Sequence, residues 1–175
     1  MYAYCLFCQT QRCHAIASLL KKRGVNQAFS PQILKRQRKK GENQDISFDL
    51  LPGYVFVFSE QELVDASYFR GIDGIIRRLG RVEDRFQLQD GDLAFAMSLY
   101  EKDGIVGAMK AVRVGDQVQL EDPLFQGCQG KITRIDARKQ RARVDFIFNA
   151  MPCFTWIACD LVNPIKPDNQ AASPK

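Results

Sequence analysis

The clearest hydrophobic pattern in the chain is an alternation over residues 54–58, which follows a Pro-Gly turn at residues 52–53. Proline fixes its own φ and glycine accepts conformations that other residues resist. Strand side chains alternate between two faces, and here one face is aromatic and the other is valine. The aromatic set is Tyr54, Phe56 and Phe58, and the valine set is Val55 and Val57. Because both faces are apolar, the pattern predicts either a strand in the middle of an α/β or α+β domain, or one face left open for a partner protein.

Similar patterns predict the other elements of the N-terminal part. We expect strands over residues 2–8, 25–34 and 71–78, and helices over residues 13–23, 60–69 and 93–100. Ser59 and Glu62 have the spacing of a capping box at the start of the second helix. The run Lys35–Lys40 carries five cations and predicts the tip of a hairpin that returns through residues 46–50. The order βαβββαβα, with helices on a mixed and mainly antiparallel sheet, is typical of an α+β sandwich.

The pattern changes after residues 102–111, which have no clear period. Short predicted strands follow at residues 112–120, 130–135, 141–148, 154–157 and 161–165. Short strands at this spacing, without helix signals, indicate a small all-β barrel. The predicted domains are therefore an α+β domain (1–101), a linker (102–111), a barrel (112–166) and a disordered tail (167–175).

Charge indicates a polyanionic partner, and the lack of long apolar stretches argues against a membrane protein. The chain has a net charge of +5, with lysines and arginines gathered in clusters, and clustered cations are suited to nucleic acid. No stretch approaches the ~20 apolar residues of a membrane span, and the N-terminus does not resemble a signal peptide. We therefore expect a cytoplasmic, monomeric protein that binds no membrane.

The cysteines suggest zinc or thiol redox chemistry only weakly. Six cysteines include Cys5 and Cys8, and Cys13 is followed by His14, the only histidine. If residues 2–8 form a strand, Cys5 and Cys8 point to opposite faces and cannot share one metal ion. We therefore expect reduced, buried thiols with no metal, no cofactor and no catalytic residue. A thiol oxidoreductase remains an alternative, although one histidine offers little general-base chemistry.

Two motifs carry a resemblance to a known family. The segment Leu51–Val57 resembles the Pro-Gly-Tyr strand of the N-terminal domain of NusG-type transcription elongation factors. The segment Val114–Val118, followed by Phe125, Gly127 and Gly130–Ile132, resembles a KOW domain, which is an SH3-like barrel. The resemblance covers nearly the whole chain. It implies a non-enzymatic factor that keeps RNA polymerase processive.

The resemblance also implies binding residues. Phe7, Tyr54 and Phe56 match the aromatic patch that receives the clamp helices of the polymerase largest subunit, and we expect this patch to be exposed. Two turns match the DNA side, facing the non-template strand. Their residues are Gln9, Gln11 and Arg12 in one turn, and Arg70 beside Gly71 in the other.

One departure from the family pattern favours a specialised paralogue. Housekeeping members carry a Gly-Arg pair where this chain has Asn149–Ala150, although Phe148 is retained. This difference puts the usual contacts with Rho and with the ribosomal protein partner in doubt, so we expect an operon-specific antiterminator. The alternatives are a housekeeping factor that links polymerase to Rho, the ribosome or other Nus factors, and a KOW-type ribosomal RNA-binding protein.

The barrel also contains a dense group of cations. They are Lys131, Arg134, Arg138, Lys139, Arg141 and Arg143. Because the apolar residues 144, 146 and 148 point one way along their strand, the arginines at 141 and 143 point the other way. We expect one solvent-facing cationic surface, either simply solvated or holding nascent RNA.

Overall fold

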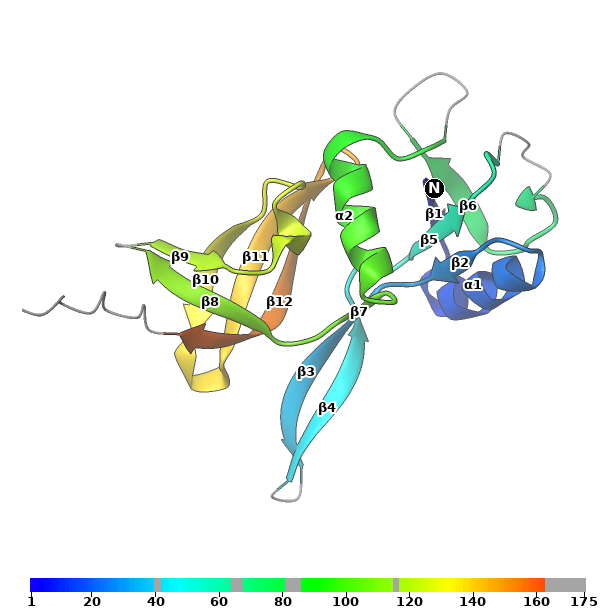
Figure 1. The fold of residues 1–175 in the computed structure, drawn as a ribbon. Helices are drawn as coiled ribbons and strands as arrows, with labels where there is room; N and C mark the ends of the chain where they lie inside the picture. The colour runs from blue at the N-terminus through cyan, green and yellow to red at the C-terminus, as the bar shows by residue number, and fades with distance from the viewer. Residues whose placement is uncertain (40–41, 64–67, 81–85, 115–116, 163–175) are drawn as a thin grey trace, which may run out of the picture.

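The computed structural model describes residues 1–39, 42–63, 68–80, 86–114 and 117–162. Figure 1 shows an N-terminal sheet, a projecting hairpin and a C-terminal barrel, with helix α2 standing between barrel and sheet. The N-terminal elements are β1 (Tyr2–Cys8), η1 (Thr10–Arg12), α1 (Cys13–Lys22), β2 (Gln27–Phe29), β3 (Gln32–Lys39), β4 (Glu42–Asp49), β5 (Tyr54–Ser59), β6 (Ile75–Leu79), α2 (Asp90–Glu101) and β7 (Ile105–Val106). The C-terminal elements are β8 (Met109–Val114), β9 (Gln117–Leu120), η3 (Pro123–Phe125), β10 (Lys131–Asp136), η4 (Ala137–Lys139), β11 (Arg141–Phe148) and β12 (Met151–Val162).

Strand β5 lies inside the four-stranded N-terminal sheet, whose order is β2-β5-β1-β6. Its two faces contribute to two separate hydrophobic clusters. Val55 and Val57 belong to one cluster, and Phe56 and Phe58 to the other. The predicted alternation is therefore confirmed, and we call these two sides the valine face and the aromatic face. Both faces are covered.

Helix α1 covers the valine face. Leu20 follows Ala17 by three residues and Ile16 by four, and all three are buried in the valine-face cluster. Lys21 and Lys22 occupy the last turn, where cations suit the negative end of a helix. Gly24, with φ +94°, follows the helix directly after the predicted range 13–23, and its left-handed backbone suits a helix end.

The predicted strand over residues 25–34 is wrong, because the chain breaks at Ser30–Pro31 into β2 and β3. Proline has no backbone N–H for a ladder, and the carbonyl of Pro31 instead accepts from the N–H of Leu50 at 2.8 Å. Beyond the break, β3 and β4 form the predicted basic hairpin, in register from Gln32 opposite Asp49 to Lys39 opposite Glu42. The hairpin projects from the body of the molecule (Figure 1).

The predicted helix over residues 60–69 falls partly on residues 64–67, which lie outside the described residues. Residues 60–63 are not helical. The hydroxyl of Ser59 accepts from the N–H of Gln61 at 3.2 Å, two residues on, so these atoms do not form the expected capping box. The predicted helix around 93–100 is confirmed as α2.

The barrel is a five-stranded sheet of order β10-β11-β12-β8-β9. The prediction of one strand over 112–120 is wrong, since β8 and β9 pair antiparallel as a hairpin. Residues 154–157 and 161–162, predicted in two strands, belong to one strand, β12, and residues 163–165 lie outside the described residues. Strand β12 pairs antiparallel with β11 and parallel with β8. Strand β11 has its predicted bounds. The α+β fold with a following barrel is confirmed.

The domain boundaries stay a prediction. The expected linker at 102–111 contains β7, which pairs parallel with β3, and the first residues of β8. The expected tail at 167–175 lies outside the described residues. Among the helices that are described, none is long and apolar enough to cross a membrane.

The cysteine geometry agrees with strand parity. Cys5 is buried in the aromatic-face cluster and Cys8 in the valine-face cluster. Burial raises the pKa of Cys5 well above its ordinary value and that of Cys8 to about 12. Within the described ranges, no group of three or more Cys, His, Asp or Glu residues could hold a metal ion.

Candidate functional site

The edge of the aromatic face carries two of the predicted binding residues in direct contact. Phe7 of β1 and Tyr54 of β5 are opposite in register, with ring centroids 5.4 Å apart in a T-shaped arrangement. Gly53 has φ +87°, and a Cβ there would lie 3.1 Å from the Phe7 ring and 3.2 Å from the carbonyl oxygen of Cys8. The Pro-Gly turn therefore leaves room for the Phe7 ring to lie beside the backbone.

The barrel covers this aromatic edge. The ring of Phe148, at the end of β11, lies 5.8 Å from Tyr54, 5.4 Å from Phe56 and 5.6 Å from Phe95 of α2. Phe56 is fully buried, while Phe7 and Tyr54 are half-buried. The expectation of an exposed patch is therefore wrong for Phe56 in this arrangement. The residues that cover it come from α2 and the barrel, which strand alternation cannot identify.

Polar contacts fix the barrel against α2. Asn149 and Ala150 have φ values of +50° and +59°, which make the β11–β12 connection a tight two-residue turn. The N–H of Asn149 donates to Oδ1 of Asp92 at 3.0 Å. Lys102 and Asp122 form a salt bridge at 2.8 Å. These contacts set the orientation of the barrel on the helix.

A close approach of two backbones completes the contact. Gly91 in the first turn of α2 faces Gly127 in the loop after η3. A Cβ on Gly91 would overlap the carbonyl oxygen of Gly127, and a Cβ on Gly127 would lie 2.8 Å from the Cβ of Ala94. Larger residues at either glycine would therefore push barrel and helix apart. Local sequence patterns do not predict this contact, because the two glycines are far apart in the chain and only packing brings them together.

The predicted DNA-side residues form an extended surface. The N–H of Gln9 donates to the carbonyl of Gly74 at 2.8 Å, and Arg12 forms a salt bridge with Asp73. These residues are exposed except for Gly74. Gln11 and Arg12 lie in η1, and Gln9 precedes it.

Arg70 occupies a different position. Its carbonyl oxygen accepts from Arg23 at 3.1 Å, and Arg23 follows the C-terminal end of α1, whereas Arg12 precedes its first residue. The predicted DNA residues therefore flank both ends of a ten-residue helix, which is about 15 Å long.

The predicted cationic surface lies on the outside of the barrel. Ala142, Val144, Phe146 and Phe148 are buried, so the parity of β11 is as predicted. Arg141 and Arg143 point outward, and each is paired with an acid: Arg141 with Asp136 at 3.3 Å and Arg143 with Asp145 at 2.7 Å. Lys131, Arg134, Arg138 and Lys139 are exposed on β10 and η4.

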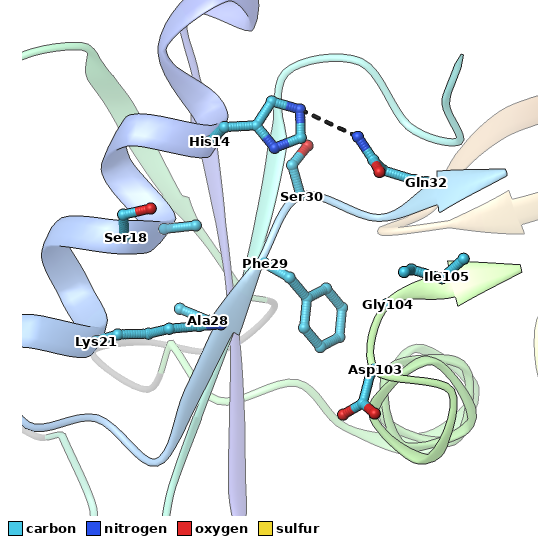
Figure 2. A pocket seen from close by; sticks show the side chains of 11 residues that line it. His14, Ser18, Lys21, Ala28, Phe29, Ser30, Gln32, Asp103, Gly104 and Ile105 are labelled. Carbon is cyan, nitrogen blue, oxygen red and sulfur yellow. Dashed lines mark hydrogen bonds between the residues drawn. The ribbon is translucent and has the colours of Figure 1, made fainter. Parts of the chain in front are cut away.

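A small pocket of about 220 Å³ lies between α1, β2 and the turn before β7. Figure 2 shows His14 of α1 reaching toward Gln32 of β3, and their side-chain nitrogens are 3.3 Å apart. His14 also lies 3.5 Å from Asp49. Within the described residues, the polar partners of His14 are therefore Gln32 and Asp49.

Comparisons with known proteins agree on one family. A family model described as "Transcription termination factor nusG" matches residues 2–94, more than half of the chain. A "Transcription termination/antitermination protein NusG" from Lactococcus lactis subsp. lactis (strain IL1403) is 30% identical over 127 residues. That alignment covers 67% of this chain and 64% of the relative, less than two thirds of its length.

A solved structure described as "Domain interaction in Thermotoga maritima NusG" is similar in fold. The TM-score is 0.53, and the match covers 89% of this chain and 92% of that one. The sequence identity is 14%, so this likeness concerns the fold alone.

Proposed function

Because the chain belongs to the NusG family of transcription termination and antitermination factors, we propose that it binds RNA polymerase through Phe7, Tyr54 and Phe56. The bound factor keeps the enzyme processive on particular operons and performs no catalysis itself. The observation that carries this proposal is the aromatic edge beneath the barrel. The ligand of this edge is the clamp-helix pair of the polymerase largest subunit.

The chemistry of the aromatic edge supports an interface role. Large rigid aromatic side chains bury much area at little entropic cost and are enriched at binding hot spots. Tyr54 keeps part of its side chain accessible, and Arg77 lies 5.7 Å from the Phe7 ring centroid. A ring that offers an apolar face beside a cation suits a helical partner with both apolar and acidic groups.

Because the barrel covers the aromatic edge, polymerase binding depends on displacement of the barrel. Phe148 occupies the space that a partner of Tyr54 and Phe56 would need. The barrel must therefore separate from the N-terminal sheet before the clamp helices bind. The apparent dissociation constant then equals the intrinsic constant divided by the open fraction. A factor regulated in this way binds best when another ligand holds its barrel.

The remaining binding residues extend the proposal. Gln9, Gln11, Arg12 and Arg70 face the non-template DNA strand, and the outer cations of the barrel bind nascent RNA or a protein partner. Phosphate contacts give affinity without sequence reading. The salt bridge from Arg12 to Asp73 lowers the charge at one end of this surface, so the affinity for DNA there is modest.

We favour a specialised antiterminator over a housekeeping factor. The Asn149–Ala150 turn replaces the housekeeping Gly-Arg pair, and the N–H of Asn149 is engaged by Asp92. Ribosome or Rho contacts through this turn would have to displace that bond. A ribosomal KOW protein is disfavoured because the family match lies in the N-terminal residues 2–94.

The test uses Gly91→Ala in the full chain and an isolated clamp-helix fragment of RNA polymerase. Alanine is favoured over glycine inside a helix by about 1 kcal/mol, yet here its Cβ would strike Gly127. We expect tighter binding of the fragment, because the open fraction rises. Gly107→Ala is the matched control, since its added Cβ meets no atom within 4 Å.

The outcomes separate two claims. If neither the wild type nor Gly91→Ala binds the fragment, the polymerase proposal fails. If both bind it equally tightly, the fragment binds without displacing the barrel, and only the conditional step fails.

A further inference from the structure

The outer face of the barrel displays two aromatic rings that the core does not use. Phe154 of β12 is 59% exposed, and Trp156, two residues further on, lies on the same face and is half-buried. The side chain of Thr155 between them is buried. Two residues of strand place their Cα atoms about 6.7 Å apart along β12.

Arginines from the neighbouring strand lie over both rings. The guanidinium of Arg143 is 4.1 Å from the Phe154 ring centroid, and that of Arg141 is 4.4 Å from the Trp156 ring. Register places Arg143 opposite Trp156, so each guanidinium reaches diagonally to a ring. The result is a ladder of alternating cations and rings on β11 and β12.

Acidic groups hold this ladder in place. Asp136 accepts from Nε of Arg141 at 3.3 Å, and Asp145 accepts from Nε of Arg143 at 2.7 Å. Because each acid accepts from Nε, the terminal N–H groups of each guanidinium stay available to donate to a ligand. The ladder is therefore oriented before any ligand arrives, which lowers the entropic cost of binding.

The charge around the ladder matches a polyanion. Its neighbours on β10 and η4 are Lys131, Arg134, Arg138 and Lys139, all exposed. Arg134 stands opposite Arg143 in register, so the cations continue across three strands. Asp136 and Asp145 each pair with an arginine of the ladder. The four neighbouring cations therefore determine the positive electrostatic potential of this surface.

We infer that Phe154 and Trp156, with Arg141 and Arg143, form a stacking platform for unpaired RNA. Bases without a pairing partner stack on aromatic rings or on guanidinium planes, while the cations contact phosphate. A duplex hides its base faces, so the rings favour a single strand. The choice of RNA rests on the proposed function, because transcription delivers its single-stranded product as RNA.

The direct test uses the fluorescence of Trp156, the only tryptophan in the chain. The full-length protein is titrated with an unstructured RNA of about 12 nucleotides. We expect the RNA to quench the tryptophan emission as a base stacks on the indole. Inorganic polyphosphate, which offers charge without bases, should bind at low salt and leave the emission unchanged.

Variants separate stacking from charge. Phe154→Ala should weaken RNA binding by about 5- to 150-fold, the effect of losing one stacked base. Ile147→Ala is the matched control, because it removes an exposed apolar side chain of the neighbouring strand β11 from the same face of the sheet. The double change of Arg138 and Lys139 to Ala should reduce the salt dependence of binding while Trp156 quenching persists. Circular dichroism confirms folding of each variant.

Several results would overturn the platform. They are equal quenching by polyphosphate, equal or tighter binding of RNA duplex or of single-stranded DNA of the same sequence, and unchanged RNA affinity in Phe154→Ala. Binding of the clamp-helix fragment is measured on the same samples. If the fragment binds and RNA does not, this inference fails while the proposed function stands.

Discussion

The two faces of strand β5 are covered in different ways. The valine face lies under α1, and the contact is mainly apolar. The aromatic face lies under α2 and Phe148 of the barrel, with polar contacts at its margin. Ile16, Ala17 and Leu20 of α1 bury apolar side chains against the valine face. The cover of the aromatic face adds polar contacts between α2 and the barrel, as a protein–protein interface does. The comparison teaches that one side of the sheet supports the fold and the other is suited to binding.

The largest expected effect is on the valine face. Leu20→Ala removes a fully buried side chain of α1 and should lower the free energy of unfolding by about 2–5 kcal/mol, since the cavity adds to the lost burial. Leu19→Ala, at a position that is 39% exposed, is the adjacent control and should change stability little. Denaturant unfolding followed by circular dichroism measures both. Equal effects would mean that α1 is not the permanent cover.

A smaller effect is expected on the aromatic face. Tyr54→Ala should weaken clamp-fragment binding by about 1–3 kcal/mol, as for an interface anchor, while the N-terminal sheet stays folded. The measurement is a titration of the fragment in the Gly91→Ala background, where the barrel is already displaced. Any further displacement caused by Tyr54→Ala then does not mask the loss of affinity. A folded Tyr54→Ala variant with unchanged affinity would assign this ring to packing alone.

The smallest expected effect concerns two thiols. Burial raises the pKa of Cys8, on the valine side, and of Cys128, beside Gly91, to about 12 in each case. Because the thiolate is the reactive form, both should react slowly at pH 8. Displacement of the barrel from α2 in Gly91→Ala should speed the labelling of Cys128 and leave that of Cys8 unchanged. Mass spectrometry after timed alkylation distinguishes the two cysteines. Equal acceleration of both in Gly91→Ala would argue against independent coverage of the two faces of β5.

The same shifts predict the direction of a pH effect on stability. An unfolded thiol releases its proton near its ordinary pKa of 9.0, and the folded thiols release theirs near 12. Their contribution to stability is therefore complete below about pH 9 and is lost as the pH rises toward 12. Cys8→Ala should make the decline shallower in this window.

The sequence by itself determined several features that depend on neighbouring residues. Strand parity gave the two faces of β5, the separation of Cys5 from Cys8, and the outward arginines of β11, because alternate side chains must point to opposite sides. The Pro-Gly turn and the basic hairpin also follow from local backbone preferences. Family motifs added the order of α+β domain and barrel.

Only the tertiary structure decided which distant residues cover which face. The burial of Phe56 depends on Phe148, and the fit of barrel to helix depends on Gly91 meeting Gly127. The arginines over Phe154 and Trp156 likewise depend on the register of β11 against β12. Periodicity states that a side chain is apolar and where it points along its own element, but packing between elements fixes what it touches. For that reason the sequence identified the aromatic edge and missed its cover.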